Sequence, residues 1–278
     1  MNTQLLQELD LKIAEINALK EQILNTSEEQ GVEPLYSLIN RVKSKKVASR
    51  IQTGIQAIDF HLGGFTEGTM INLAGQSFTG KSTLVIDAIK HIALEEKVLF
   101  FSFEMYENLL VKNKLSDVND IQAKNILIEQ KRNDLNSIEA IIRKYSKDVR
   151  LFVIDSRMKI KVDSNLQEYQ KNSLISSTLA KLTQELGCVI LCIQQISIDD
   201  LKNGRLGFKG SGDTVYDSDI ALFIVKDEKS ETRTLICTKD RTNERSWKED
   251  ITDVKYQQNK AISETKFEQQ EIEMVFPF

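Results

Sequence analysis

A glycine-rich loop between an apolar run and a helical pattern constrains this chain more than any other feature. The stretch "LAGQSFTGKSTL", Leu73 to Leu84, has the spacing G-x-x-x-x-G-K-[ST]. Glycines let backbone N–H groups of such a loop turn inward, where the positive end of the following helix dipole favours an anion. The stretch therefore predicts a phosphate-binding loop. Its predicted phosphate contacts are Gly75, Gln76, Ser77, Phe78, Thr79, Gly80, Lys81, Ser82 and Thr83.

The rest of the chain from Arg50 alternates between strand and helix patterns. Such alternation predicts an α/β fold with a mostly parallel central sheet and crossover helices. The segment from 106 to 147 is polar with helical periodicity. Apolar runs predict strands at 69–75, 97–105, 149–155 and 188–195, and a final pair at 218–225 and 232–240 joined by the turn-like "KDEKSE".

Residues 1 to about 30 carry a separate amphipathic pattern, in which apolar residues recur in steps of three and four. This pattern predicts an N-terminal helix that packs on its own domain or docks on a neighbouring subunit, although Lys20 interrupts the stripe and weakens a long coiled coil. The basic segment "NRVKSKKVASR" then resembles a linker. We therefore divide the chain into an N-terminal helix and linker at 1–45, one core at 46–258, and an acidic tail at 259–278.

Composition narrows the classes of protein that the chain can be. Its 278 residues, 41% of them hydrophobic, are enough for one large core, and no apolar run reaches the roughly 18 to 20 residues that cross a bilayer. We expect a cytoplasmic protein.

The net charge of −4 means that any binding to nucleic acid would be local, through loops that concentrate Lys and Arg. The three cysteines lie in apolar runs and the two histidines lie far apart, which predicts buried, reduced thiols and no histidine-based centre.

Polar side chains end three of the predicted strands. Asp155 closes "RLFVID", where a carboxylate could hold Mg²⁺ through water beside the Ser82 hydroxyl. Glu104 closes "LFFSFE", where it could orient and deprotonate an attacking water. Gln195 ends "CVILCIQQ" and could sense the terminal phosphate. An acid after a strand is more often a helix cap or part of a turn, but its occurrence with the phosphate loop favours a nucleotide site, with ATP and Mg²⁺ as the expected ligands.

Several stretches, in this order, resemble one family. "TGIQAIDFHLGGFTEGTMINLAG" looks like the start of a RecA-type core, and "FFSFEM" is similar to the Ser-Leu-Glu-Met motif of DnaB-type replicative helicases. "SSTLAKLTQELGCVILCIQQIS", "GSGDTVYDSDIALFIVKDE" and "LICTKDRTNER" resemble later motifs of that family. The resemblance runs from about Arg50 to about Phe267. It implies a RecA-like core that resembles the C-terminal motor domain of these helicases.

The resemblance also implies roles for single residues. Glu104 falls on the family's catalytic glutamate, Asp155 on its Walker B aspartate and Gln195 on its switch glutamine. Lys239 and Arg241 fall on the pair that reaches the neighbouring subunit's γ-phosphate in such rings. Two loops are placed against DNA, with the candidate cations Lys159, Lys161, Lys202, Arg205 and Lys209.

The chain also departs from the helicase pattern. It has only a helix and a linker where full-length helicases carry a large N-terminal domain, "VIDS" stands where "IDY" is usual, and the hairpin "KDRTNE" lacks the usual Asn-Gly. These departures make an accessory or phage- or plasmid-borne ATPase plausible. The tail "EQQEIEMVFPF" could occupy the basic pocket of a partner such as a replication protein, or could be unordered.

Three hypotheses about function follow from these observations. The first is an ATP-driven DnaB-like helicase or translocase that forms a ring, expected to be hexameric, around single-stranded DNA in replication. The second is a RecA-like recombinase or mediator that forms filaments on DNA. The third is an oligomeric ATP-binding scaffold that does not act on DNA.

Overall fold

The computed structural model describes residues 12, 34–44, 49–162, 165–197, 206–208, 217–227 and 229–252. Chain contacts divide the protein into two units, one ending at Ser49 and one beginning at Arg50, and each is described by itself. Within the described ranges, no helix has both the length and the apolar character that a membrane crossing requires.

In the first unit, helix α2 spans Leu35–Ser44. Residues 40–44, the first part of the predicted linker, are thus helical, because apolar residues recur at helical spacing just before them. Leu35, Tyr36 and Ile39 are exposed on this helix. The helix predicted over residues 1–30 lies outside the described residues apart from Lys12, and the tail predicted at 259–278 lies outside them entirely.

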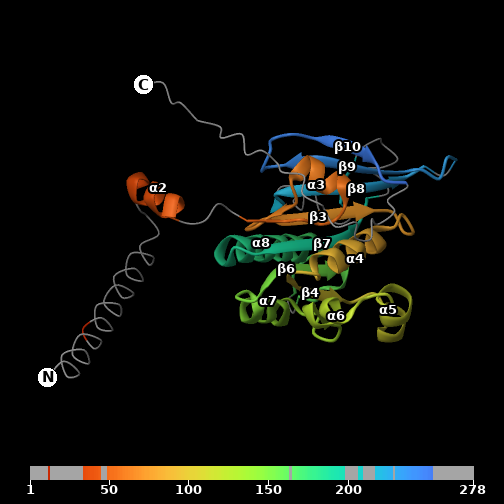
Figure 1. Ribbon diagram of the computed structural model, residues 1–278, viewed down its shortest axis with the longest axis horizontal. Coiled ribbons are helices and arrows are strands. Elements are labelled where there is room, and N and C mark those ends of the chain that lie inside the picture. Colours follow the sequence, from red (N-terminus) through yellow and green to blue (C-terminus); the bar gives the residue numbers. More distant parts are fainter. Residues whose placement is uncertain are drawn as a thin grey trace. The chain divides into compact units, whose positions relative to one another are not determined.

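The second unit is built on an eight-stranded sheet in the order β10-β9-β8-β3-β7-β6-β4-β5 (Figure 1). Strands β3 to β8 pair in parallel, and β9 and β10 continue the sheet antiparallel beyond β8. The strands are β3 (Met70–Gly75), β4 (Lys97–Ser102), β5 (Ile126–Glu129), β6 (Val149–Asp155), β7 (Val189–Gln195), β8 (Ile220–Lys226), β9 (Arg233–Asp240) and β10 (Trp247–Asp250). The predicted mostly parallel sheet and its final hairpin are confirmed.

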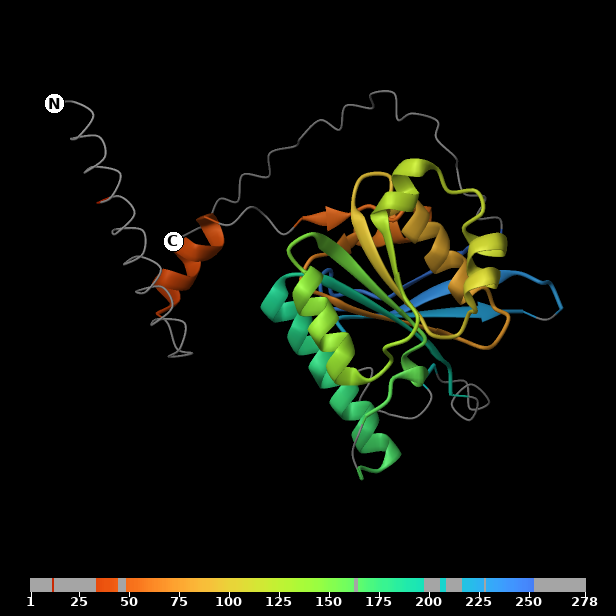
Figure 2. The same ribbon diagram turned by 90° about the horizontal axis from the view of Figure 1, so that it is seen from below.

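Helices cover both faces of this sheet, which is why its central strands are almost wholly apolar (Figure 2). Successive strand residues point to opposite faces, so that Ile71 and Leu73 pack in one cluster with α3 and α4, whereas Met70 packs in the other with α7 and α8. The helices are α3 (Gln56–Leu62), α4 (Lys81–Ile92), α5 (Glu107–Lys114), α6 (Asp120–Asn125), α7 (Leu135–Tyr145), the 3₁₀ helix η1 (Arg157–Lys159) and α8 (Glu168–Leu186).

The start of the core is fixed by a small two-stranded sheet and one carboxylate. Strands β1 (Arg50–Ile51) and β2 (Phe65–Thr66) pair antiparallel around α3. Asp59 on α3 accepts hydrogen bonds from the Thr53 N–H, the Thr53 hydroxyl and the Gly54 N–H, each at 2.8 Å. One side chain therefore satisfies three donors and holds the lead-in segment against the first helix.

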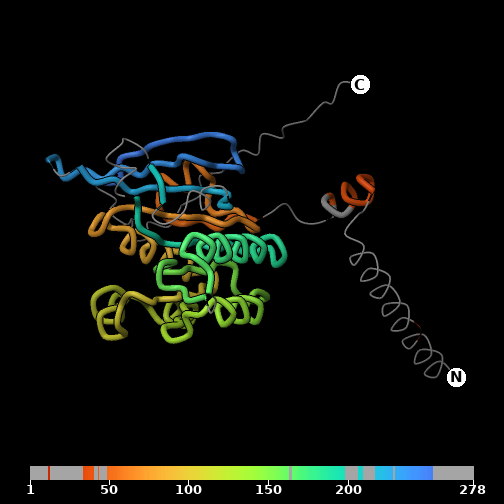
Figure 3. The backbone as a smooth tube through the Cα atoms, turned by 180° about the vertical axis from the view of Figure 1, so that it is seen from behind, coloured from red at the N-terminus to blue at the C-terminus, as the bar shows by residue number. Residues whose placement is uncertain are grey.

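Strands β5 and β10 of the eight-stranded sheet were not predicted from the sequence, and they are its two edge strands (Figure 3). Strand β5 has four residues inside the segment that we predicted to be helical, and it forms by pairing with β4. Strand β10 reads "WKED", in which only Trp247 is buried. Such strands arise from tertiary pairing and not from an apolar pattern of their own.

The parallel strands bring their carboxyl ends together. Gly75 of β3 lies in register with Gln195 of β7, and Asp155 of β6 lies in register with Ser102 of β4. The Phe103 N–H also donates to the Asp155 carbonyl at 2.7 Å, which joins the ends of β4 and β6. The carboxyl ends of the parallel strands form one side of the sheet, which we call its carboxyl edge. This carboxyl edge gathers residues that are up to 120 positions apart in the sequence, from Gly75 to Gln195.

Candidate nucleotide-binding site

The glycine loop leaves β3 at Gly75 and enters α4 at Lys81. Gly80 has φ of 97°, in the left-handed region that favours glycine. A Cβ on Gly75 would lie 2.7 Å from the Ile224 carbonyl oxygen and 2.8 Å from the Thr79 hydroxyl oxygen, so no larger residue fits there without movement. The loop therefore has the conformation and the position, at a helix N-terminus, that a phosphate site requires.

The Lys81 ammonium lies over this loop. Its Nζ donates to the carbonyl oxygens of Gly75 at 2.9 Å and Gln76 at 2.6 Å. Burial lowers the pKa of Lys81, while the nearby Asp155 and Glu104 carboxylates raise it. The cation is thus held at the mouth of the loop, where a bound phosphate would compete with the two carbonyl groups for it.

Asp155 is the most deeply buried acid of the site, with 1% of its surface exposed. Burial and the Glu104 charge raise the pKa of Asp155 to about 6, although the neighbouring Ser82 hydroxyl and Lys81 oppose the shift. Among the described residues, neither carboxylate oxygen makes a hydrogen bond of standard geometry. Buried, weakly satisfied carboxylate oxygens beside a hydroxyl are a donor set suited to Mg²⁺, so these residues fit the predicted ion.

Glu104 lies two residues beyond β4 and is exposed. One of its oxygens, Oε1, accepts a hydrogen bond of 2.6 Å from the hydroxyl of Ser156, which follows Asp155 across a cis peptide bond. Glu104 borders a hollow of about 590 Å³ that also includes Gln130 and Lys159. The Glu104 side chain therefore faces space in which a water or a phosphate could lie.

Gln195 ends β7 beside Gly75, as the sequence predicted for a residue next to the phosphate loop. The preceding Gln194 is fully buried and accepts a hydrogen bond of 3.1 Å from Arg157. The tip of β7 is therefore tied on one side to the loop strand and on the other to the segment that follows Asp155.

Arg157 is a buried cation that sequence reasoning missed. Only 1% of its surface is exposed, and besides Gln194 it donates to the Asn172 carbonyl at 2.5 Å and the Ser176 hydroxyl at 3.2 Å. Burial lowers the pKa of its guanidinium, and the Asp217 carboxylate opposes that shift. A signal was present in the sequence, because Arg157 lies two residues after an apolar strand, and an arginine that turns inward there needs buried acceptors. Arg157 links η1, β7 and α8 at the base of the predicted DNA loops.

The structure describes only part of those loops. Lys159 ends η1 and is exposed, and it shares the hollow with Glu104. Lys161 is exposed, and its main chain bonds to Asn133 and Leu135 beside α7. Lys202, Arg205 and Lys209 lie outside the described residues.

Lys239 and Arg241 lie toward the opposite edge of the sheet, which is formed by the amino ends of the parallel strands. The Arg241 N–H donates to the Asp219 carbonyl, and the Asp219 N–H donates to the carbonyl of Met70, the first residue of β3. The Arg241 guanidinium also lies 3.3 Å from the Asp219 carboxylate, and burial and Arg241 lower the pKa of Lys239. Arg241 therefore lies near the start of β3, whereas the phosphate loop follows the end of that strand. The six residues of β3 rise by about 3.3 Å each, so Arg241 lies roughly 20 Å from the phosphate loop of its own chain.

A different cation, Arg233, adjoins the loop within the same chain. Its Cζ and Nε lie 3.9 Å from the place where a Cβ on Gly80 would be. Arg233 begins β9, and β8 joins that strand to the loop strand β3. Sequence reasoning missed it because nothing in the local pattern links the two positions.

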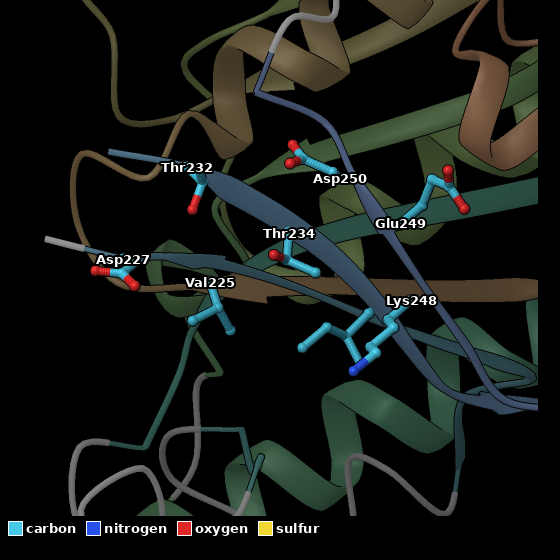
Figure 4. A pocket seen from close by; sticks show the side chains of 8 residues that line it. Val225, Asp227, Thr232, Thr234, Lys248, Glu249 and Asp250 are labelled. Carbon is cyan, nitrogen blue, oxygen red and sulfur yellow. The ribbon is translucent and has the colours of Figure 1, made fainter. Parts of the chain in front are cut away.

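A groove of about 480 Å³ along β8, β9 and β10 is a separate feature (Figure 4). It is bordered by Val225, Asp227, Thr232, Thr234, Ile236, Lys248, Glu249 and Asp250. Three carboxylates and one ammonium border it, so its charge disfavours a phosphate. It contains none of the predicted site residues.

The cysteines are confirmed as free, buried thiols. Burial raises the pKa of Cys188 to about 11, and those of Cys192 and Cys237 to about 12. Such thiols stay protonated at neutral pH and are unreactive.

Residues 50–129 match the model of the DnaB-like helicase C terminal domain. The chain is 23% identical over 224 residues to the replicative DNA helicase DnaB of Treponema pallidum, covering 69% of this chain and 51% of that protein. It is 28% identical over 231 residues to the replicative DNA helicase DnaB of Mycoplasma pneumoniae, covering 67% and 49%. By sequence this chain therefore resembles the C-terminal domain of DnaB-like helicases.

Solved structures share the same fold. A DnaB-like replicative helicase superimposes with a TM-score of 0.63 at 18% sequence identity, over 80% of this chain and 64% of that one. The RadB recombinase superimposes with a TM-score of 0.54 at 17% identity, over 72% of this chain and 94% of that one. The chain spans about half the length of the curated relatives that it matches.

We predict that replacing Arg157 destabilises the fold. Arg157→Met should lower the free energy of unfolding by about 3 kcal/mol, because it removes the guanidinium that donates to buried acceptors on β7 and α8. Urea unfolding followed by circular dichroism measures this difference. Arg143→Met is the matched control: Arg143 forms ion pairs with Glu139 and Glu185 on the surface, and its loss should cost less than about 1 kcal/mol. Equal stability of Arg157→Met and the wild type would contradict the prediction.

We also predict a pH dependence from Asp155. Its folded-state pKa of about 6 exceeds the ordinary value of 3.8, so the folded chain keeps a proton that the unfolded chain releases, and stability falls as the pH rises between these values. Without Mg²⁺ and nucleotide, Asp155→Asn should be more stable than the wild type by up to about 3 kcal/mol near pH 8, and by less near about pH 5.

Denaturant unfolding across this pH range, in the presence of a chelator, measures the effect. Asp134→Asn serves as a control of opposite sign, because hydrogen bonds from Ser137 lower the pKa of Asp134 and its charge stabilises the fold above that pKa. If the stability of Asp155→Asn and of the wild type depends on pH in the same way, burial does not disfavour the charged form of the Asp155 carboxyl.

Proposed function

We propose that this protein is an ATP-hydrolysing DNA motor, a helicase or translocase, that acts as a ring on single-stranded DNA. The observation that carries the shared, ATP-hydrolysing site in this proposal is the division of charged residues between two edges of one sheet. Lys81, Asp155 and Glu104 gather at the carboxyl edge, whereas Lys239 and Arg241 lie toward the opposite edge. The named DnaB relatives, which are replicative helicases, support the assignment.

The residues of the carboxyl edge would divide the work of hydrolysis. The loop amides and Lys81 would hold the phosphates of ATP, and Glu104 would accept a proton from the attacking water. The water oxygen would form a bond to the terminal phosphorus while the bond to the leaving oxygen of ADP breaks, which yields ADP and inorganic phosphate. A magnesium ion near Ser82 and Asp155 would neutralise charge on the phosphates.

Lys239 and Arg241 would complete the site of a neighbouring subunit. With Arg241 roughly 20 Å from its own phosphate loop, the pair is poorly placed to act within one chain. A head-to-tail contact between copies brings opposite edges together, so the pair of one copy would face the loop of the next. Cations supplied in this way stabilise the charge that develops in phosphoryl transfer and make hydrolysis depend on assembly.

Hydrolysis would reach DNA through the segments that follow Asp155 and Gln195. Lys159 borders the same hollow as Glu104, so the base of one predicted loop is contiguous with the proposed hydrolytic residue. Exposed lysines in such loops would contact the DNA backbone, with little reading of base sequence. We propose Gln195 as the residue that passes the state of the terminal phosphate to the second loop.

The first test asks whether the site hydrolyses ATP. Lys81→Ala should abolish hydrolysis, and Glu104→Gln should lower kcat about 100-fold or more while nucleotide binding persists. Phosphate release with Mg²⁺, with and without single-stranded DNA, measures this, and unwinding of a forked duplex measures motor activity. Glu95→Gln, which changes an exposed glutamate beyond the end of α4, is the control that should match the wild type. D-loop formation without unwinding would favour a recombinase. If DNA does not stimulate hydrolysis and the protein does not bind DNA, a scaffold would be favoured.

The second test asks whether the site is shared between subunits. Chains with Glu104→Gln and chains with Arg241→Ala should each be nearly inactive, but a 1:1 mixture should regain about one quarter of wild-type activity, because about that share of interfaces combines two intact halves. A mixture of Glu104→Gln and Lys81→Ala is the matched control and should regain none, since both changes affect the same half. Failure of the first mixture to recover would place Arg241 outside a shared site.

A further inference from the structure

The residue after Asp155 contacts the proposed hydrolytic glutamate. The Ser156 hydroxyl donates to Glu104 Oε1 at 2.6 Å, a short distance typical of a charge-assisted hydrogen bond. Ser156 is 3% exposed, whereas Glu104 is exposed. A buried hydroxyl thus holds one end of a side chain that otherwise projects into the hollow.

The backbone around both residues is fixed. The Phe103 N–H donates to the Asp155 carbonyl at 2.7 Å, and the Gln130 side chain donates to the Met105 carbonyl at 2.9 Å, so the main chain is held on both sides of Glu104. The Ser156 carbonyl in turn accepts from the Lys159 N–H at 2.9 Å, at the first turn of η1. With both main chains fixed, the remaining freedom of Glu104 lies in its side-chain torsions, and the bond from Ser156 restricts these.

We propose that Ser156 is a positioning residue for ATP hydrolysis. Its hydroxyl fixes Glu104 through Oε1, so that Oε2 is presented to the attacking water. A carboxylate can accept at both oxygens, and therefore the bond from Ser156 leaves it able to take the proton. This inference rests on the proposed function and adds to it a residue that does not touch the nucleotide.

A purely structural role would predict different behaviour. A buried serine that only satisfies its own hydroxyl affects stability when it is replaced, and its loss leaves the rate per folded chain unchanged. A serine that orients the general base affects kcat and leaves the affinity for ATP unchanged, because the orientation matters in the transition state and not in the bound ground state.

The first experiment is therefore steady-state ATP hydrolysis by full-length variants. Ser156→Ala should lower kcat about tenfold, which corresponds to about 1.4 kcal/mol, with KM for ATP unchanged within about twofold. Ser156→Thr keeps the hydroxyl and should restore most of the rate. Ser156→Cys keeps the volume but has a weaker donor, so it should fall between these two. Thermal melting checks that each variant is folded.

Two controls separate positioning from general damage. Ser146→Ala removes a partly exposed hydroxyl that bonds to the Arg143 carbonyl at the end of α7, far from Glu104 in the sequence, and should leave kcat unchanged. In a Glu104→Gln background, Ser156→Ala should have no further effect, because the group that it positions is already lost. A tenfold loss in that background, or a rise in kcat for Ser156→Ala alone, would overturn the inference.

A second readout does not depend on turnover. In crystal structures of the nucleotide-free protein, the Glu104 carboxylate should keep one position in the wild type and in Ser156→Thr, and should leave it in Ser156→Ala. If the wild type proves unable to hydrolyse ATP but Glu104 is released as expected, the proposed function fails and Ser156 still positions Glu104. If Ser156→Ala hydrolyses ATP at the wild-type rate, the inference fails and the proposed function stands.

Discussion

The site depends on one buried carboxylate at the end of a parallel strand. Asp155 is enclosed because β6 has paired neighbours on both sides and helices on both faces, and this enclosure raises its pKa to about 6. The nearby cation Lys81 is shared with two carbonyl groups of the loop. A chain that buries a charge in this way gains stability from any ligand that supplies a cation, so we expect Mg²⁺ and nucleotide to stabilise the fold as they bind.

Three consecutive residues make the end of β6 a junction. Asp155 faces the phosphate loop, Ser156 bonds to Glu104, and Arg157 bonds to Gln194 on β7 and to residues of α8. Because these contacts start from adjacent positions on one backbone, a displacement of the strand end would move all of them together. A change at a bound phosphate would thus have a short physical route to the base of the predicted DNA loops.

The sequence predicted the parts of the protein that follow from local pattern. Apolar runs predicted the central strands, because a strand buried on both faces has few alternatives, and the glycine spacing predicted the loop between β3 and α4. Strand β10 and the proximity of Arg233 to the loop were missed because each depends on a partner far along the chain. The bond from Ser156 to Glu104 joins residues 52 positions apart, and no periodicity carries that information. The serine was visible as a departure from the helicase motif, but its partner was not.

The positions of Lys239 and Arg241 bear on the choice between a ring and a filament. The opposite edges of the sheets in two copies can meet only in a head-to-tail contact. Such contacts repeat from copy to copy, and the assembly is a closed ring or an open helical filament, depending on the rotation between copies. The same shared site would serve both assemblies, since it needs only one loop and one pair of cations at each interface. The chemistry of hydrolysis therefore does not separate a ring-shaped motor from a filament-forming recombinase. The rotation between copies separates these two assemblies. That rotation is set by the surfaces around the site and not by the residues within it.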